Sequence, residues 1–149
     1  STRLRPAAET VASFPSPWTE PVPSSLIARA AARQGWISTL AIHEGAGRDT
    51  AVDNLSRFRE AGGRVVYGTD LGNGPLPLGV NRRELLALQE AGIRGDALVA
   101  SLTDPWPARM GTDAVRSFLA DPAPTDPDDL ATWLSRAVVV PTEELTRVD

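Results

Sequence analysis

The chain has 149 residues, of which 42% are hydrophobic, and its formal net charge is −4. This length fits one ordinary domain with a buried core, and an acidic balance without a basic cluster argues against nucleic-acid binding. The sequence contains neither cysteine nor lysine, which excludes disulfides, thiolate metal sites and lysine-based covalent catalysis.

The sequence also argues against a membrane protein. No apolar run approaches the roughly 20 residues that a membrane-spanning helix needs. The first ten residues contain no apolar stretch of the kind found in a signal peptide, so we expect a cytoplasmic protein. The first residue is Ser1 and the only methionine is Met110. Two explanations stay open: a trimmed start, or a piece of a longer polypeptide.

Helices and strands are expected to alternate through the central part of the chain. The apolar periodicity predicts a helix over 24–35, a strand over 36–42, a helix over 49–63, a strand over 64–68 and a helix over 81–92. The two strands start at residues 36 and 64, close to the roughly 30-residue length of a βαβ unit. The pattern therefore predicts an α/β protein with a parallel sheet.

Residues at the helix ends support these boundaries. Asp49 is the expected N-cap of the helix over 49–63. Asn81 is the expected N-cap of the helix over 81–92, and Glu84 follows three residues later, close to a capping box.

The remainder of the chain is predicted to be mainly helical. Further helices are expected over 95–102, 113–120 and 127–136, followed by a short strand or extended segment over 137–141. Asp126 is the expected cap of the last helix. We expect residues 1–111 to form one unit, with 112–149 as a helical extension packed on the same domain.

The segment VVYGTDLGNG, residues 65–74, carries the first candidate for chemistry. Asp70 follows the carboxyl end of a predicted strand, where parallel α/β architectures bind ligands and present catalytic side chains. A carboxylate there can hold a metal ion or accept a proton from a bound water. One alternative is an ordinary turn. Another is a phosphate-binding loop over 68–79, although its glycine spacing does not match the known fingerprints.

Two more residues are candidates for the same edge. His43 is the only histidine, and it follows the strand predicted over 36–42, one strand over from Asp70. It could bind substrate, carry protons or ligate a metal, and the alternative is a solvated loop residue. Asn73, in the loop after Asp70, is a further candidate for substrate binding.

Residues 61–111 resemble the end of the catalytic barrel in the amidohydrolase superfamily. The motifs that carry the resemblance are Gly68-Thr69-Asp70 before a glycine-rich loop, then Glu84-Leu85, Ala91-Gly92 and Leu102-Thr103. A less specific resemblance extends back to about residue 15. It implies that the chain is the C-terminal part of a (β/α)8 TIM-type barrel, about strands 6–8 with their helices, plus a helical tail.

The resemblance also implies an activity. It implies a metal-dependent hydrolase of C–N bonds (amide, cyclic amide or related), with one or two divalent ions, zinc being the expected metal. It makes Asp70 a metal ligand and the general base for the attacking water, and it leaves most other ligands outside this chain.

A full barrel needs about 250 residues, more than the 149 present. We therefore expect a second polypeptide carrying the N-terminal barrel strands, or a homo-oligomer, together with a small-molecule substrate. The alternative is a non-catalytic binding or structural remnant of this fold.

Overall fold

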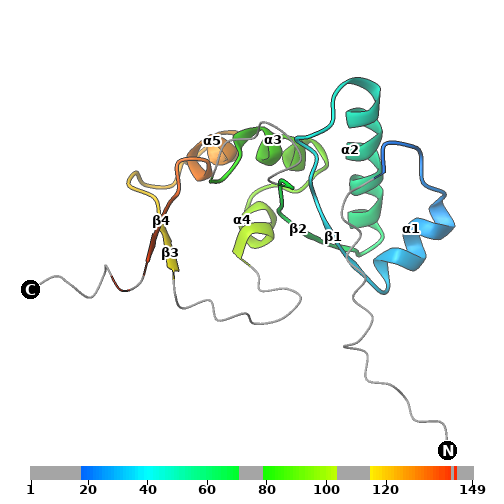
Figure 1. The fold of residues 1–149 in the computed structure, drawn as a ribbon, viewed down its shortest axis with the longest axis horizontal. Helices are drawn as coiled ribbons and strands as arrows, with labels where there is room; N and C mark the ends of the chain where they lie inside the picture. The colour runs from blue at the N-terminus through cyan, green and yellow to red at the C-terminus, as the bar shows by residue number, and fades with distance from the viewer. Residues whose placement is uncertain (1–17, 71–78, 104–114, 142, 144–149) are drawn as a thin grey trace, which may run out of the picture.

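The computed structural model describes residues 18–70, 79–103, 115–141 and 143. In chain order the elements are α1 (Ser24–Ala31), β1 (Gly35–Ile37), α2 (Gly45–Glu60), β2 (Arg64–Val66), α3 (Arg82–Glu90), α4 (Asp96–Thr103), β3 (Val115–Phe118), a 3₁₀ turn (Pro127–Asp129), α5 (Leu130–Leu134) and β4 (Val138–Pro141). The described part of the chain is thus a mixed α/β structure with two small sheets and no closed barrel (Figure 1).

The first sheet is the parallel pair of β1 and β2, joined by α2. Their register pairs Gly35 with Arg64, Trp36 with Val65, and Ile37 with Val66. The ladder continues beyond both strands, because the Ser38 N–H donates to the Val66 carbonyl at 2.9 Å and the Thr39 N–H donates to the Gly68 carbonyl at 3.0 Å. The predicted strand–helix–strand unit with parallel strands is therefore confirmed.

The core lies between this sheet and the helices packed on it. Its largest fully buried apolar side chains come from α2, α3, α4 and the loop after β1: Phe58, Leu40, Leu55, Leu85, Leu88 and Leu98. Burying a leucine or phenylalanine side chain of this kind stabilises a fold by about 1.5–3 kcal/mol. Trp36 stacks on Phe58 with ring centroids 4.0 Å apart, which fixes β1 against α2.

The C-terminal segment meets this body through α5. Ala131 and Leu134 are buried in the same core cluster, and Arg82 of α3 donates to the Thr132 hydroxyl at 2.9 Å. β3 and β4 form an antiparallel ribbon that projects away from the body (Figure 1). The ribbon leaves Phe118 and Val138 exposed, so the two regions differ in how much apolar surface they bury.

Several predicted boundaries need correction. The helix predicted over 113–120 is wrong, because residues 115–118 form β3. These residues pair with β4, which begins 20 residues after β3 ends. The second helix begins at Gly45, and its cap position is Glu44 rather than Asp49.

Other predictions about the C-terminal segment hold. The Asp126 side chain accepts the Asp128 N–H at 2.9 Å, so that cap is confirmed, and β4 matches the predicted final strand. The helix predicted over 127–136 divides into the 3₁₀ turn and α5. Among the described residues, no helix has both the length and the apolar character needed to cross a membrane.

Candidate functional site

Both parallel strands lead into a residue with a left-handed backbone. Thr39 has φ 41° and Asp70 has φ 53°, and no other non-glycine residue in the described part of the chain has a positive φ. This conformation is a genuine outlier for a β-branched residue such as threonine. It costs of the order of 1–3 kcal/mol and is concentrated at functional sites in proteins. The carboxyl edge of the pair is therefore the first place to examine for chemistry.

Asp70 lies at this edge. It comes two residues after Gly68, whose carbonyl accepts the last hydrogen bond of the ladder. Thr69 is buried, whereas Asp70 is exposed. The position predicted from the sequence is thus observed, and the metal-binding and proton-accepting roles of Asp70 remain predictions.

The strand predicted over 36–42 ends at Ile37, so His43 lies six residues past β1, in the loop that leads into α2. Its N–H donates to the Leu40 carbonyl at 3.1 Å in the turn that leads into α2. Partial burial lowers the pKa of the imidazole, which favours the neutral ring, the form that binds metals and accepts protons. Asn73, the third candidate, lies outside the described residues.

Beneath this edge lies a buried carboxylate, that of Glu84 on α3. The side chain is fully buried, and its Oε1 accepts the Leu40 N–H at 3.0 Å while its Oε2 accepts the Ala41 N–H at 2.6 Å. Burial raises the pKa of Glu84, against the opposing effect of these N–H donors, the Ser38 hydroxyl and the Arg48 charge. The net rise means that burial outweighs the donors.

The capping arrangement at the start of α3 explains why Glu84 can reach the loop. The Asn81 side chain accepts the Glu84 N–H at 3.1 Å, so the predicted cap is confirmed. The reciprocal bond of a capping box is replaced, because the Asn81 N–H donates to the Tyr67 hydroxyl at 2.7 Å. Tyr67, whose pKa is raised by burial, therefore takes the capping task and leaves the Glu84 carboxylate to the β1–α2 loop.

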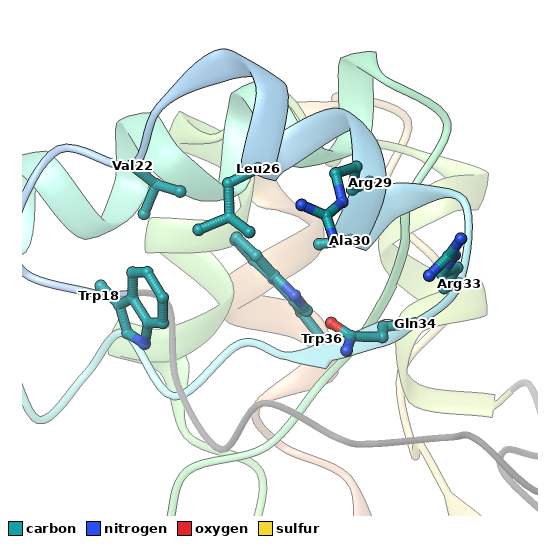
Figure 2. Close-up of a pocket in the computed structure, with 8 residues that line it drawn as sticks. All are labelled: Trp18, Val22, Leu26, Arg29, Ala30, Arg33, Gln34 and Trp36. Carbon is teal, nitrogen blue, oxygen red and sulfur yellow. The ribbon is translucent and has the colours of Figure 1, made fainter.

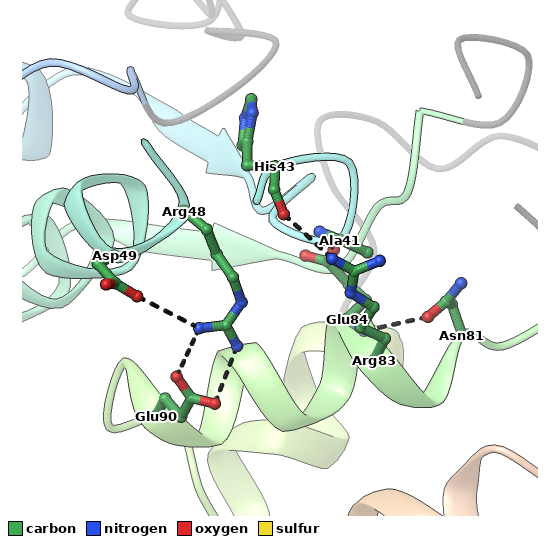
Figure 3. Close-up of polar contacts among 8 residues, drawn as sticks. All are labelled: Ala41, His43, Arg48, Asp49, Asn81, Arg83, Glu84 and Glu90. Atoms are coloured by element: carbon green, nitrogen blue, oxygen red, sulfur yellow. Dashed lines mark hydrogen bonds and ion pairs between the residues drawn. The ribbon is translucent and has the colours of Figure 1, made fainter. Parts of the chain in front are cut away.

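Surface contacts also link α3 to this loop and to α2 (Figure 3). Arg83 donates to the His43 carbonyl at 3.3 Å and approaches the Glu44 carboxylate at 3.6 Å. Arg48 forms two hydrogen bonds of 2.9 Å with Glu90. Figure 3 shows the His43 ring directed away from α3 while its carbonyl faces Arg83.

The metal-binding capacity of the described residues is limited. No three His, Cys, Asp or Glu side chains gather in this part of the chain so as to hold a metal ion. The exposed Asp70 carboxylate fits one position of a coordination sphere. A complete site would need further ligands from residues outside the described ranges or from a second chain.

An apolar pocket of about 130 Å³ lies elsewhere, between α1 and the amino end of β1 (Figure 2). Trp18 and Trp36 line it together with aliphatic side chains, and Arg29, Arg33 and Gln34 stand beside them. None of the described residues that line it carries a carboxylate, imidazole or hydroxyl group. The pocket can therefore bind an apolar group, and the acid–base groups are at the opposite end of β1.

Sequence reasoning assigned Glu84 only to a helix cap and missed its contact with the loop. A signal was present, because Glu84 lies in the apolar stripe of its helix, beside Leu85 and one turn before Leu88. A charged residue in such a stripe is rarely buried without a partner.

Compared with known proteins, the chain matches no family model, no curated protein and no solved structure.

Proposed function

We propose that this chain is the C-terminal part of a metal-dependent, amidohydrolase-like hydrolase of C–N bonds, with about strands 6–8 of a TIM-type barrel. The observation that carries the proposal is Asp70, an exposed carboxylate just past the carboxyl end of a parallel strand. The strained Thr39, two residues past the end of the paired strand, supports a site rather than a plain turn.

The Asp70 carboxylate would hold the metal as one ligand and would accept the proton of the attacking water. When bound, a divalent metal such as zinc lowers the pKa of water and polarises the bond to be cleaved. His43, whose pKa is lowered by partial burial, and Asn73 contact the small-molecule substrate. These roles need no other titratable group from the described residues.

The rest of the barrel comes from a second polypeptide or from another copy of this chain. Within the described ranges, β1 and β2 pair with no third strand. Parallel sheets are normally larger than two strands and are covered on both faces. The half-exposed Trp18 beside the apolar pocket adds surface that a partner would cover.

A binding or structural module without catalysis is the second candidate. The observation that favours it is the pocket lined by Trp18 and Trp36, an apolar binding surface to which the described residues bring no carboxylate or imidazole. This candidate predicts a stable, metal-free monomer, whereas the hydrolase predicts tight association with a chain that supplies the other metal ligands.

The first experiment purifies the chain and determines its mass in solution, its metal content and the sequence of any co-purifying chain. The assembled protein is then assayed on amide and cyclic amide substrates. Asp70→Asn should reduce kcat by about 10²–10⁴-fold, the usual contribution of a general base, and should leave the circular dichroism spectrum unchanged. Asp96→Asn, at an exposed aspartate in the first turn of α4, is the matched control. Full activity in Asp70→Asn would refute the assignment.

A further inference from the structure

The four residues after β1, 38–41, each donate a backbone N–H hydrogen bond. The first two donate to carbonyls of β2 and of the residues after it. The next two, from Leu40 and Ala41, donate to the two oxygens of Glu84 at 3.0 Å and 2.6 Å. The Glu84 carboxylate therefore continues the ladder where the neighbouring strand stops supplying acceptors.

The left-handed Thr39 is the point at which the chain changes partner. Its own N–H still bonds to the carbonyl of Gly68, just after β2, and the two following N–H groups donate to Glu84 of α3. Leu40 and Ala41 are 0% and 2% exposed, so water cannot replace the carboxylate as their acceptor. A buried N–H that loses its acceptor is strongly unfavourable, and the loop would have to rearrange.

We propose that Glu84 is a positioning residue: its two oxygens fix the β1–α2 loop and thereby set where His43 stands at the edge that carries Asp70. The inference rests on the proposed function only in giving this edge a catalytic role. The geometry of the loop stands without it.

The charge balance around Glu84 agrees with a geometric role. Burial raises the pKa of Glu84 more than its donors and Arg48 lower it, so the ionised form is held at a net loss of stability. What Glu84 supplies is the conformation of the loop.

The decisive variant is Glu84→Gln, which keeps the shape of the side chain but replaces one oxygen with an NH₂ group that cannot accept an N–H. Hydrogen exchange at Leu40 or Ala41, whichever loses its acceptor, should accelerate about tenfold or more. His43 is the only histidine, so its ring gives one unambiguous set of NMR signals. Because partial burial lowers the pKa of His43, release of the loop should raise that pKa toward the ordinary value of about 6.5.

Two controls separate positioning from general effects. Glu90→Gln removes the same charge from the same helix, but Glu90 bonds to Arg48 rather than to the loop amides. Leu86→Ala should lower the melting temperature because it removes apolar contacts between α3 and the core. Neither control should change the exchange of Leu40 and Ala41 in the folded state or the titration of His43.

The proposal is overturned if folded Glu84→Gln keeps the wild-type exchange rates at Leu40 and Ala41 and the wild-type His43 titration. If that variant does not fold, the wild-type chain decides: exchange of these two amides at the rate of an open loop overturns the proposal, and protection comparable with Leu55 in α2 supports it. None of these measurements needs metal or substrate. Failure of the hydrolase proposal is therefore recognised separately, by the absence of turnover.

Discussion

The α/β body and the C-terminal segment are stabilised by different kinds of contact. The body, residues 18–70 and 79–103, contains the fully buried leucines and the buried Glu84 with its two backbone donors. The segment over 115–141 adds Ala131 and Leu134 to that core, and its partly buried Leu119, Leu130 and Trp133 pack against it. Its ion pairs, Arg94 with Asp128 and Arg136 with Asp121, involve exposed side chains.

This difference shows where the chain can hold reactive groups in fixed positions. Surface ion pairs typically contribute only about 0–1 kcal/mol and tolerate movement. The strained Thr39 and Asp70 occur in the body, next to a buried hydrogen-bond network that can hold them. The ribbon of β3 and β4 exposes Val138 and Val139 by 60% and 55%, which suits contact with another surface better than chemistry.

The largest expected effect tests the contrast between the two regions directly. Leu88→Ala, at a fully buried position of α3, should lower the free energy of unfolding by about 2–5 kcal/mol. Val139→Ala in the exposed ribbon should change it by less than about 0.5 kcal/mol. Urea unfolding followed by circular dichroism measures both. Equal losses would show that the ribbon is packed in solution and that the contrast is wrong.

A smaller effect is expected at the edge itself. A Cβ at Gly68 would lie 2.2 Å from Cγ2 of Ile37, so Gly68→Ala must push the two strands apart. Overpacking of this kind costs about 1–3 kcal/mol, and the exchange of the Thr39 amide should accelerate with it.

The matched control for this variant is Gly47→Ala in α2. There a Cβ would meet Thr19 at 3.4 Å, and alanine is the better helix former by about 1 kcal/mol. It should be neutral or stabilising. A Gly68→Ala protein as stable as the wild type would mean that β1 and β2 are less closely packed than the structure shows.

Local signals predicted the body better than the C-terminal segment. The apolar stripes of α2 and α3 and the cap at Asn81 depend on residues close in sequence, and each is observed. The strand β3 depends on pairing with β4, which no local pattern reveals, since strand formation responds mainly to its neighbours. The early start of α2 at Gly45 is similar, because Arg48 is held by Glu90 of another helix.

The position of the site could be predicted from the sequence, whereas the contacts that hold the β1–α2 loop in place could not. The carboxyl ends of parallel strands meet at one edge, so Asp70 and His43 could be placed from the order of elements alone. The role of Glu84 depends on Tyr67 taking over the capping bond and on the loop passing over α3. Both are tertiary contacts, and the sequence indicated only that a charged residue occupied an apolar stripe.

The smallest expected effect concerns pH and again separates the two regions. Because the folded pKa of Glu84 is raised, the native state binds more protons than the unfolded state between the two pKa values. The contribution of Glu84 is therefore fully present below the unfolded pKa and is lost as the pH rises through the folded one. The pKa of His43 is shifted downward, which gives the opposite slope, so the comparison is made in a His43→Asn background.

Two proteins are compared: the His43→Asn variant and the double variant that also carries Glu84→Gln. The free energy of unfolding should fall more steeply with rising pH in the first, which keeps Glu84. Asp121→Asn, which removes the exposed partner of Arg136, should leave the slope unchanged because surface charges are well screened. Urea unfolding at a series of pH values gives each slope. If the pH dependence changes with Asp121→Asn and not with Glu84→Gln, the pH-sensitive contacts lie in the C-terminal segment. The Glu84 carboxylate would then be too well solvated to fix the loop.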